Sequence, residues 1–151
     1  MPGNGYDGGG LLDTFATGAM GNASGYFGVK FREPTESELA FFKRTGVPGY
    51  AAPDNAVVLN PSPPQGVNMD AVAKNEAARV FMRQNPDAAP KFGLTDEQSS
   101  LLSGTTYKGA DPLDRRSTIA ARLLSGDPSG GTPTPEQAAY LRMLRAKMGA
   151  N

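Results

Sequence analysis

Apolar residues recur at helical spacing in several stretches of the chain, and each stretch begins and ends with residues typical of helix termini. Thr35, Thr95 and Thr134 are each followed three residues later by Glu or Gln, which is the capping-box pattern at a helix start. Asp111 precedes a proline, as an N-cap residue often does. The sequence therefore predicts four or five short helices, within residues 35–46, 68–85, 95–104, 111–126 and 134–149.

The apolar stripes of these helices give the expected core. The stripe residues are Leu39, Phe42, Met69, Val72, Ala73, Ala77, Val80, Phe81, Leu101, Leu102, Leu113, Ala120, Leu123, Leu124, Tyr140, Leu141, Leu144 and Met148, with Ile119 beside them. In residues 68–85 the charged positions fall on the other side of the helix, with Glu76 and Arg79 spaced to form an ion pair. We expect that charged side to face water.

Two stretches have the pattern of short strands. Tyr26 to Phe31 alternates, with Phe27, Val29 and Phe31 on one face, and residues 56–59 form an apolar run that fits an edge strand. Pro and Gly fill the joints between the elements. The expected fold is mainly α: a small bundle of four to five short helices with one or two short strands.

The first 29 residues differ in composition from the rest of the chain. They contain nine of the 19 glycines, yet apolar side chains are spaced among them, unlike in a purely flexible linker. Burying those side chains does not offset the entropy of ordering so many glycine-rich residues, so a neighbouring surface must help. We expect an extended docking arm over 1–33 and a helical domain over 34–151. The expected partner-binding residues of the arm are Leu11, Leu12, Phe15, Met20, Tyr26, Phe27, Val29 and Phe31.

Composition argues against much of enzyme chemistry. The chain has no histidine and no cysteine, which removes the commonest general base and metal ligand and every thiol nucleophile. Carboxylate chemistry and an all-oxygen metal site remain open. Fifteen basic residues balance fifteen acidic ones, so no long-range attraction to nucleic acid or to an anionic membrane is expected. We expect no enzymatic activity, no cofactor and no metal.

Four features of the sequence contain residue types that are found in chemical sites. Glu76 has the residue type of a general base, but pairing with Arg79 or capping a neighbouring helix end explains it better. Asp111 and Asp114 resemble a carboxylate pair, but they also suit the start of a helix. The turn around Asp127 lacks the Lys-Ser/Thr ending of a phosphate loop. Five arginines near the C-terminus could contact phosphate, but solvated helix faces are the better interpretation: Arg115, Arg116, Arg122, Arg142 and Arg145.

The apolar runs are too short to cross a bilayer, so no membrane partner is expected. The opening stretch also lacks the basic and continuous apolar regions of a secretion signal, its first basic residue being Lys30.

Three stretches in combination resemble small uncharacterised proteins of tailed bacteriophages and prophages: AAPDNAVVLNP, NEAARVFM and FGLTDEQ with the following TIAARLLSGDPSGGTPTPEQAAYLRMLR. The resemblance covers roughly residues 47–147 and carries no assigned activity. It implies a phage origin. The expected function is a non-enzymatic virion structural protein, made in the host cytoplasm and located in the virion. Its partners would be capsid, portal, neck or tail subunits in a symmetric assembly. The alternative is an early phage regulator that binds a host protein or nucleic acid.

Overall fold

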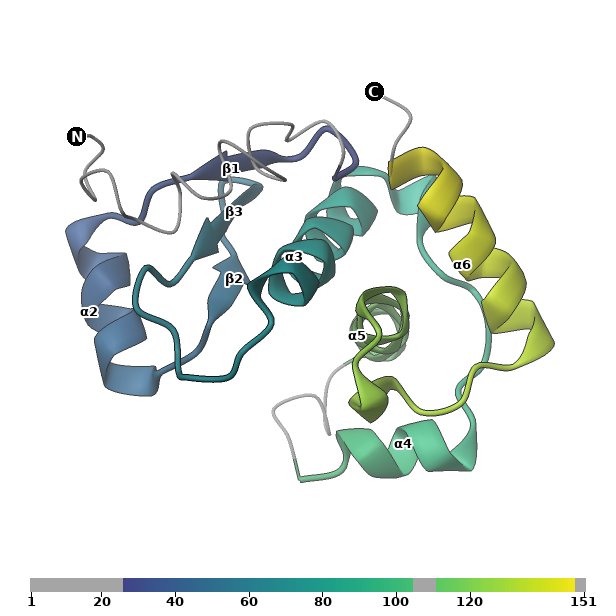
Figure 1. The fold of residues 1–151 in the computed structure, drawn as a ribbon. Helices are drawn as coiled ribbons and strands as arrows, with labels where there is room; N and C mark the ends of the chain where they lie inside the picture. Colours follow the sequence, from purple (N-terminus) through teal and green to yellow (C-terminus); the bar gives the residue numbers. More distant parts are fainter. Residues whose placement is uncertain (1–25, 105–110, 149–151) are drawn as a thin grey trace.

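The structure of the chain, a computed structural model, describes residues 26–104 and 111–148. It is rich in helix, as expected, and contains a three-stranded sheet (Figure 1). The helices are α2 (Glu36–Thr45), α3 (Met69–Gln84), α4 (Asp96–Leu102), α5 (Pro112–Ser125) and α6 (Pro135–Met148). The strands are β1 (Lys30–Arg32), β2 (Gly49–Ala51) and β3 (Ala56–Leu59), and short 3₁₀ turns lie at Pro86–Ala88 and Pro128–Gly130.

Strand β3 lies at the centre of the sheet, so the expectation of an edge strand at residues 56–59 was wrong. It pairs in parallel with β1 and antiparallel with β2. All four of its residues are buried, because helices cover both faces of the sheet. Val58 packs with Phe42 of α2 on one face, whereas Val57 and Leu59 belong to the main core, which includes α3, on the other.

Helix α3 is the central element of the domain. It lies between the sheet and α5, with α6 beyond (Figure 1). The expected stripe residues Ala73, Ala77 and Val80 are fully buried. Ala78 and Met82, which lie outside the predicted stripe, are buried as well. A helix with neighbours on several sides needs small residues to let them approach, and the alanines of α3 supply these.

The predicted helix starts are confirmed. Thr35 and Thr95 form complete capping boxes with Glu38 and Gln98. Asp111 accepts a hydrogen bond from the backbone N–H of Asp114 at 2.9 Å, and Pro112 begins α5. The α5 end is confirmed too, because Gly126 adopts the left-handed conformation at φ 78°.

Gln98 of α4 and Gln137 of α6 join two of these helix starts. Each side-chain oxygen accepts from the backbone N–H of its own capping threonine, Thr95 at 3.0 Å and Thr134 at 3.1 Å. Each side-chain nitrogen donates to the other glutamine's oxygen at 2.8 Å. The second hydrogen of each amide goes to a backbone carbonyl, of Gly130 and Gly93 respectively. Both side chains are fully buried, and every polar group of the two amides has a partner.

Replacing each capping threonine tests these helix boundaries. Thr35→Ala, Thr95→Ala and Thr134→Ala should each lower the free energy of unfolding by about 1 kcal/mol, because each leaves a backbone N–H in the first turn without its acceptor. Urea denaturation of the three variants measures this. Thr132→Ala is the control for losing a threonine hydroxyl in an exposed position, because the Thr132 hydroxyl makes no hydrogen bond within the described residues. Three neutral capping variants would contradict the boundaries.

Residues 26–33 belong to the folded domain, and the expected boundary at residue 33 was wrong. Tyr26, Phe27 and Val29 are at most 7% exposed and form part of the main core. Phe27 stacks on Phe81 of α3 with ring centroids 4.6 Å apart. Its backbone N–H donates a hydrogen bond to the carbonyl of Met148, the last residue of α6. The strand itself is shorter than the alternation indicated. It covers only residues 30–32, because a turn occupies 26–28.

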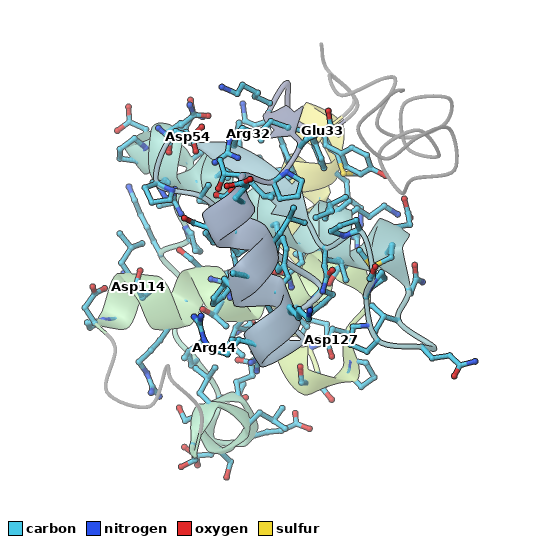
Figure 2. All side chains as sticks on the ribbon, turned by 90° about the vertical axis from the view of Figure 1, so that its left-hand side faces the viewer. Arg32, Glu33, Arg44, Asp54, Asp114 and Asp127 are labelled. Atoms are coloured by element: carbon cyan, nitrogen blue, oxygen red, sulfur yellow. The ribbon has the colours of Figure 1, made fainter. Side chains whose placement is uncertain are left out.

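Arg32 ties β1 to the rest of the sheet layer. Its guanidinium binds the Glu38 carboxylate of α2 through two hydrogen bonds of 2.7 and 2.9 Å, and it also contacts Asp54 in the β2–β3 turn at 2.9 Å. Tyr50 of β2 donates its hydroxyl to Glu38. The hydrogen bonds from Arg32 lower the pKa of Glu38 to about 2. Figure 2 shows Arg32 and Asp54 side by side near the start of α2.

Candidate functional site

Two hollows of the domain adjoin one another along the α3–α5 pair. One has a volume of about 650 Å³ and the other about 530 Å³, and Val47, Gly49 and Glu76 line both. We call this combined depression the edge groove. Its floor is α3, one wall is the segment 47–51 that leads into and forms β2, and the other wall is α5.

The two ends of helix α5 border the edge groove. Leu113, Asp114 and Ser117 line the larger hollow, and Ser125 and Asp127 line the smaller one. Figure 2 shows Asp114 and Asp127 well apart, on either side of the C-terminal end of α2. Because an α-helix rises 1.5 Å per residue, the 14 residues of α5 make this wall about 21 Å long.

The opposite wall is a sheet edge with unpaired backbone groups. Strand β2 pairs with β3 through hydrogen bonds at Ala52–Ala56 and at Pro48–Asn60. In an antiparallel pair bonded and non-bonded residues alternate, so Tyr50 faces β3 while Gly49 and Ala51 point their N–H and C=O groups away from it. Arg83 of α3 donates to the Ala51 carbonyl at 3.3 Å. Within residues 26–104 and 111–148, no hydrogen bond reaches the Gly49 N–H or C=O or the Ala51 N–H.

Glu76 lies at the middle of the edge groove, where the two hollows meet. Its side chain is only 18% exposed, and its nearest cationic atom is Arg79 Nε at 3.9 Å. No side-chain or backbone donor in the described part of the chain forms a hydrogen bond with its carboxylate. Burial raises the pKa of Glu76 to about 7, and the positive charges of Arg79 and Arg83 offset this only in part.

The ion pair expected between Glu76 and Arg79 is therefore present but long, and the expectation of a water-facing charged side was wrong for Glu76. Arg79 also donates to Asn75 at 3.2 Å and to Thr118 of α5 at 3.1 Å. Arg83 donates to the Ala52 carbonyl at 2.8 Å. The polar side of α3 thus faces the sheet edge and α5.

A pH series with Glu76→Gln tests this desolvation. The folded state holds the Glu76 proton more tightly than the unfolded state, so Glu76 favours folding below pH 4.5 and loses that contribution as pH rises to 7. A shift from 4.5 to about 7 corresponds to about 3 kcal/mol. Relative to the wild type, Glu76→Gln should therefore gain about 3 kcal/mol between pH 4.5 and pH 8, measured by urea denaturation.

The exposed Glu136 gives the matched control, because Glu136→Gln also removes one negative charge from the chain. A difference between wild type and Glu76→Gln that stays constant from pH 4.5 to pH 8 would show that water solvates the carboxylate in the folded state.

The expected partner-binding residues divide into two groups. Leu11, Leu12, Phe15 and Met20 lie outside the described residues. Tyr26, Phe27 and Val29 are buried in this chain's own core, and Phe31 is half-buried against it. These four are held by their own domain, so the expectation that they bind a partner is wrong for the buried three. Their apolar character signalled burial, but the sequence did not show against which chain.

Several other residues named in the sequence analysis are exposed or form hydrogen bonds within the domain. Leu39 and Leu113, expected in core stripes, are 42% and 44% exposed, and Leu113 lies at the edge groove. Arg116 and Arg122 donate to the carbonyls of Pro90 and Ser129. Arg142 and Arg145 are exposed on α6, so the five arginines divide between structural bonds and surface positions.

The groove residues that sequence reasoning missed are Gly49, Ala51 and Ser117. Strand β2 has only three residues and no alternating pattern, so nothing in the sequence marked it as a sheet edge. Gly49 is the one residue of this segment whose type indicates close packing of the backbone against a neighbour. An added Cβ there would lie 3.1 Å from side-chain atoms of both Leu59 and Val72, which explains why glycine lies between strand and helix.

Within the described residues there is no cluster of three or more acidic side chains placed to hold a metal ion. In the same part of the chain, no helix combines the length and the apolar character needed to span a bilayer. Comparisons of the chain with protein-family models, with curated proteins and with solved structures find no match.

Proposed function

We propose that this chain is a non-enzymatic structural protein of a bacteriophage virion that binds another protein through the edge groove. One observation carries the binding role: the unpaired edge of the three-residue strand β2 lines a groove whose opposite wall, α5, is about 21 Å long. Such an edge recognises extended polypeptide through backbone hydrogen bonds, a frequent mode of peptide recognition. The phage origin rests on the resemblance of residues 47–147 to phage and prophage proteins.

The chemistry of the groove favours binding over catalysis. Glu76 is its one strongly desolvated acid, and the neighbouring Arg79 and Arg83 are engaged with side chains and carbonyls of this domain. Ser117 lines the same hollow, but the sequence has no histidine that could activate it. The partners in this proposal are capsid, portal, neck or tail subunits.

Mass spectrometry of purified particles tests the virion assignment. A phage that encodes this chain should contain it in stoichiometric amounts relative to a known neck or tail protein, in full particles and in particles emptied of DNA. A host protein of similar abundance in the lysate gives the background for adventitious carry-over. Its absence from particles, with expression early in infection, would instead support the regulator alternative.

A further inference from the structure

We propose that residues 11–17 of a neighbouring copy of this chain bind in the edge groove as an added strand on β2. The inference deepens the proposed function and rests on its claim that the groove binds an extended polypeptide. It identifies the occupant as the chain's own N-terminal segment, supplied by a second copy.

The unpaired groups of β2 set the chemistry of the occupant. The Gly49 N–H and C=O and the Ala51 N–H all point into the groove from the sheet edge. Gly49 is buried there, and buried backbone groups without partners are costly. An extended backbone placed beside β2 would supply an acceptor and a donor in the alternation that this edge requires.

The length of the groove matches one segment of the sequence. Residues 11–17 read LLDTFAT and lie between Gly10 and Gly18. Seven residues in an extended conformation span about 23 Å, compared with about 21 Å for the α5 wall. Glycines on both sides allow the chain to enter and leave the groove without restriction on its backbone angles.

The side chains of this segment suit the groove as well. Leu11 and Phe15 are spaced to share one face of a strand, and apolar contacts are offered by Val47, Val67 and Leu113. Thr14, the middle residue of the segment, lies on the other face of the strand, and Glu76 lies where the two hollows of the groove meet. A threonine hydroxyl is a donor, which the Glu76 carboxylate lacks among the described residues.

The position of residue 26 favours a neighbouring copy as the source. Strands β1 and β2 are the two opposite edges of the sheet, and residues 26–28 lead into β1. Phe27 stacks on Phe81 of α3, and its backbone N–H donates to the carbonyl of Met148 at the end of α6. Eight residues separate Thr17 from Tyr26, and the nine steps from one Cα to the next reach about 30 Å at most, while the path in one chain must go around the sheet or α3.

Disulfide trapping in the full chain tests the proposal directly, because the chain contains no cysteine of its own. One protein carries Thr14→Cys, and a second, with a C-terminal tag for identification, carries Ser117→Cys on the groove wall. On mild oxidation of the mixture, these two should form a cross-linked heterodimer at least about tenfold faster than Thr14→Cys does with Arg145→Cys, which lies on the exposed side of α6.

Ala51→Pro, added to the Ser117→Cys protein, removes an N–H that points into the groove and is not used by β3. It should reduce the trapping rate to that of the Arg145→Cys control, while circular dichroism shows that the fold is retained. Should that variant fail to fold, Phe15→Asp in the Thr14→Cys protein makes the same test from outside the described domain.

Equal trapping rates at Ser117 and Arg145 would overturn the proposal. So would a chain carrying both Thr14→Cys and Ser117→Cys that closes its disulfide within one molecule at high dilution, because the segment would then occupy its own groove. The particle analysis is independent of this result. If trapping fails while the protein is still found in virions, only the occupant of the groove is refuted. If trapping succeeds and the protein is absent from virions, only the virion assignment is refuted.

Discussion

A chain that begins at residue 34 is expected to be unfolded in buffer, whereas one that begins at residue 26 should fold. The shorter chain loses Tyr26, Phe27 and Val29, each at most 7% exposed. Burial of three such side chains contributes about 7 kcal/mol. That loss is comparable with the whole stability of a typical domain, about 5–15 kcal/mol.

Further contacts are lost with the same residues. Strand β1 pairs with β3 over three residue pairs, and its removal exposes one side of the central strand. Arg32 is removed too, so the Glu38 carboxylate keeps only the Tyr50 hydroxyl and the Thr35 N–H as hydrogen-bond donors. Far-ultraviolet circular dichroism and amide exchange on the two truncated chains measure the outcome. A cooperative thermal transition in the chain that begins at residue 34 would show that residues 26–33 are dispensable.

The helix boundaries could be predicted because they depend on chemistry within four residues of each start. Thr35 with Glu38 and Asp111 with Pro112 place their helix starts without reference to the rest of the fold. The central position of β3 needed more than local information. An apolar run of four residues fits a strand, but its burial on both faces depends on α2 and α3, which are distant in sequence.

The same limit explains the two main errors about individual residues. Glu76 lies on the polar side of α3, which local patterning assigns to water, but α5 and the β2 edge cover that side. Phe27 and Val29 follow a glycine-rich stretch, and composition assigned them to the arm that precedes them. The contacts of Phe27 come from Phe81 and from the end of α6, 54 and more residues further along the chain, and Val29 belongs to the same core. The edge groove could not be predicted at all, because three segments that are distant in the sequence form it.

Gln137→Leu should destabilise the domain by about 4 kcal/mol. The change removes four hydrogen bonds at once. The Thr134 N–H and the Gly93 carbonyl lose their partner, and each atom of the Gln98 amide loses one of its two. Leucine fills the volume but leaves these polar groups buried and unpaired, at a cost of about 1–3 kcal/mol for each fully buried one.

A double-mutant cycle separates the glutamine pair from the two capping boxes. In urea denaturation, Gln98→Ala and Gln137→Ala together should cost at least about 1 kcal/mol less than the sum of the two single variants, since both singles break the same two amide bonds. Thr134→Ala is the matched control, because it removes the other half of the α6 box and leaves the amide pair in place. Strictly additive costs would mean that the two amides act only within their own helices. Coupling of the expected size would show that the starts of α4 and α6, 39 residues apart in the sequence, are stabilised as one unit.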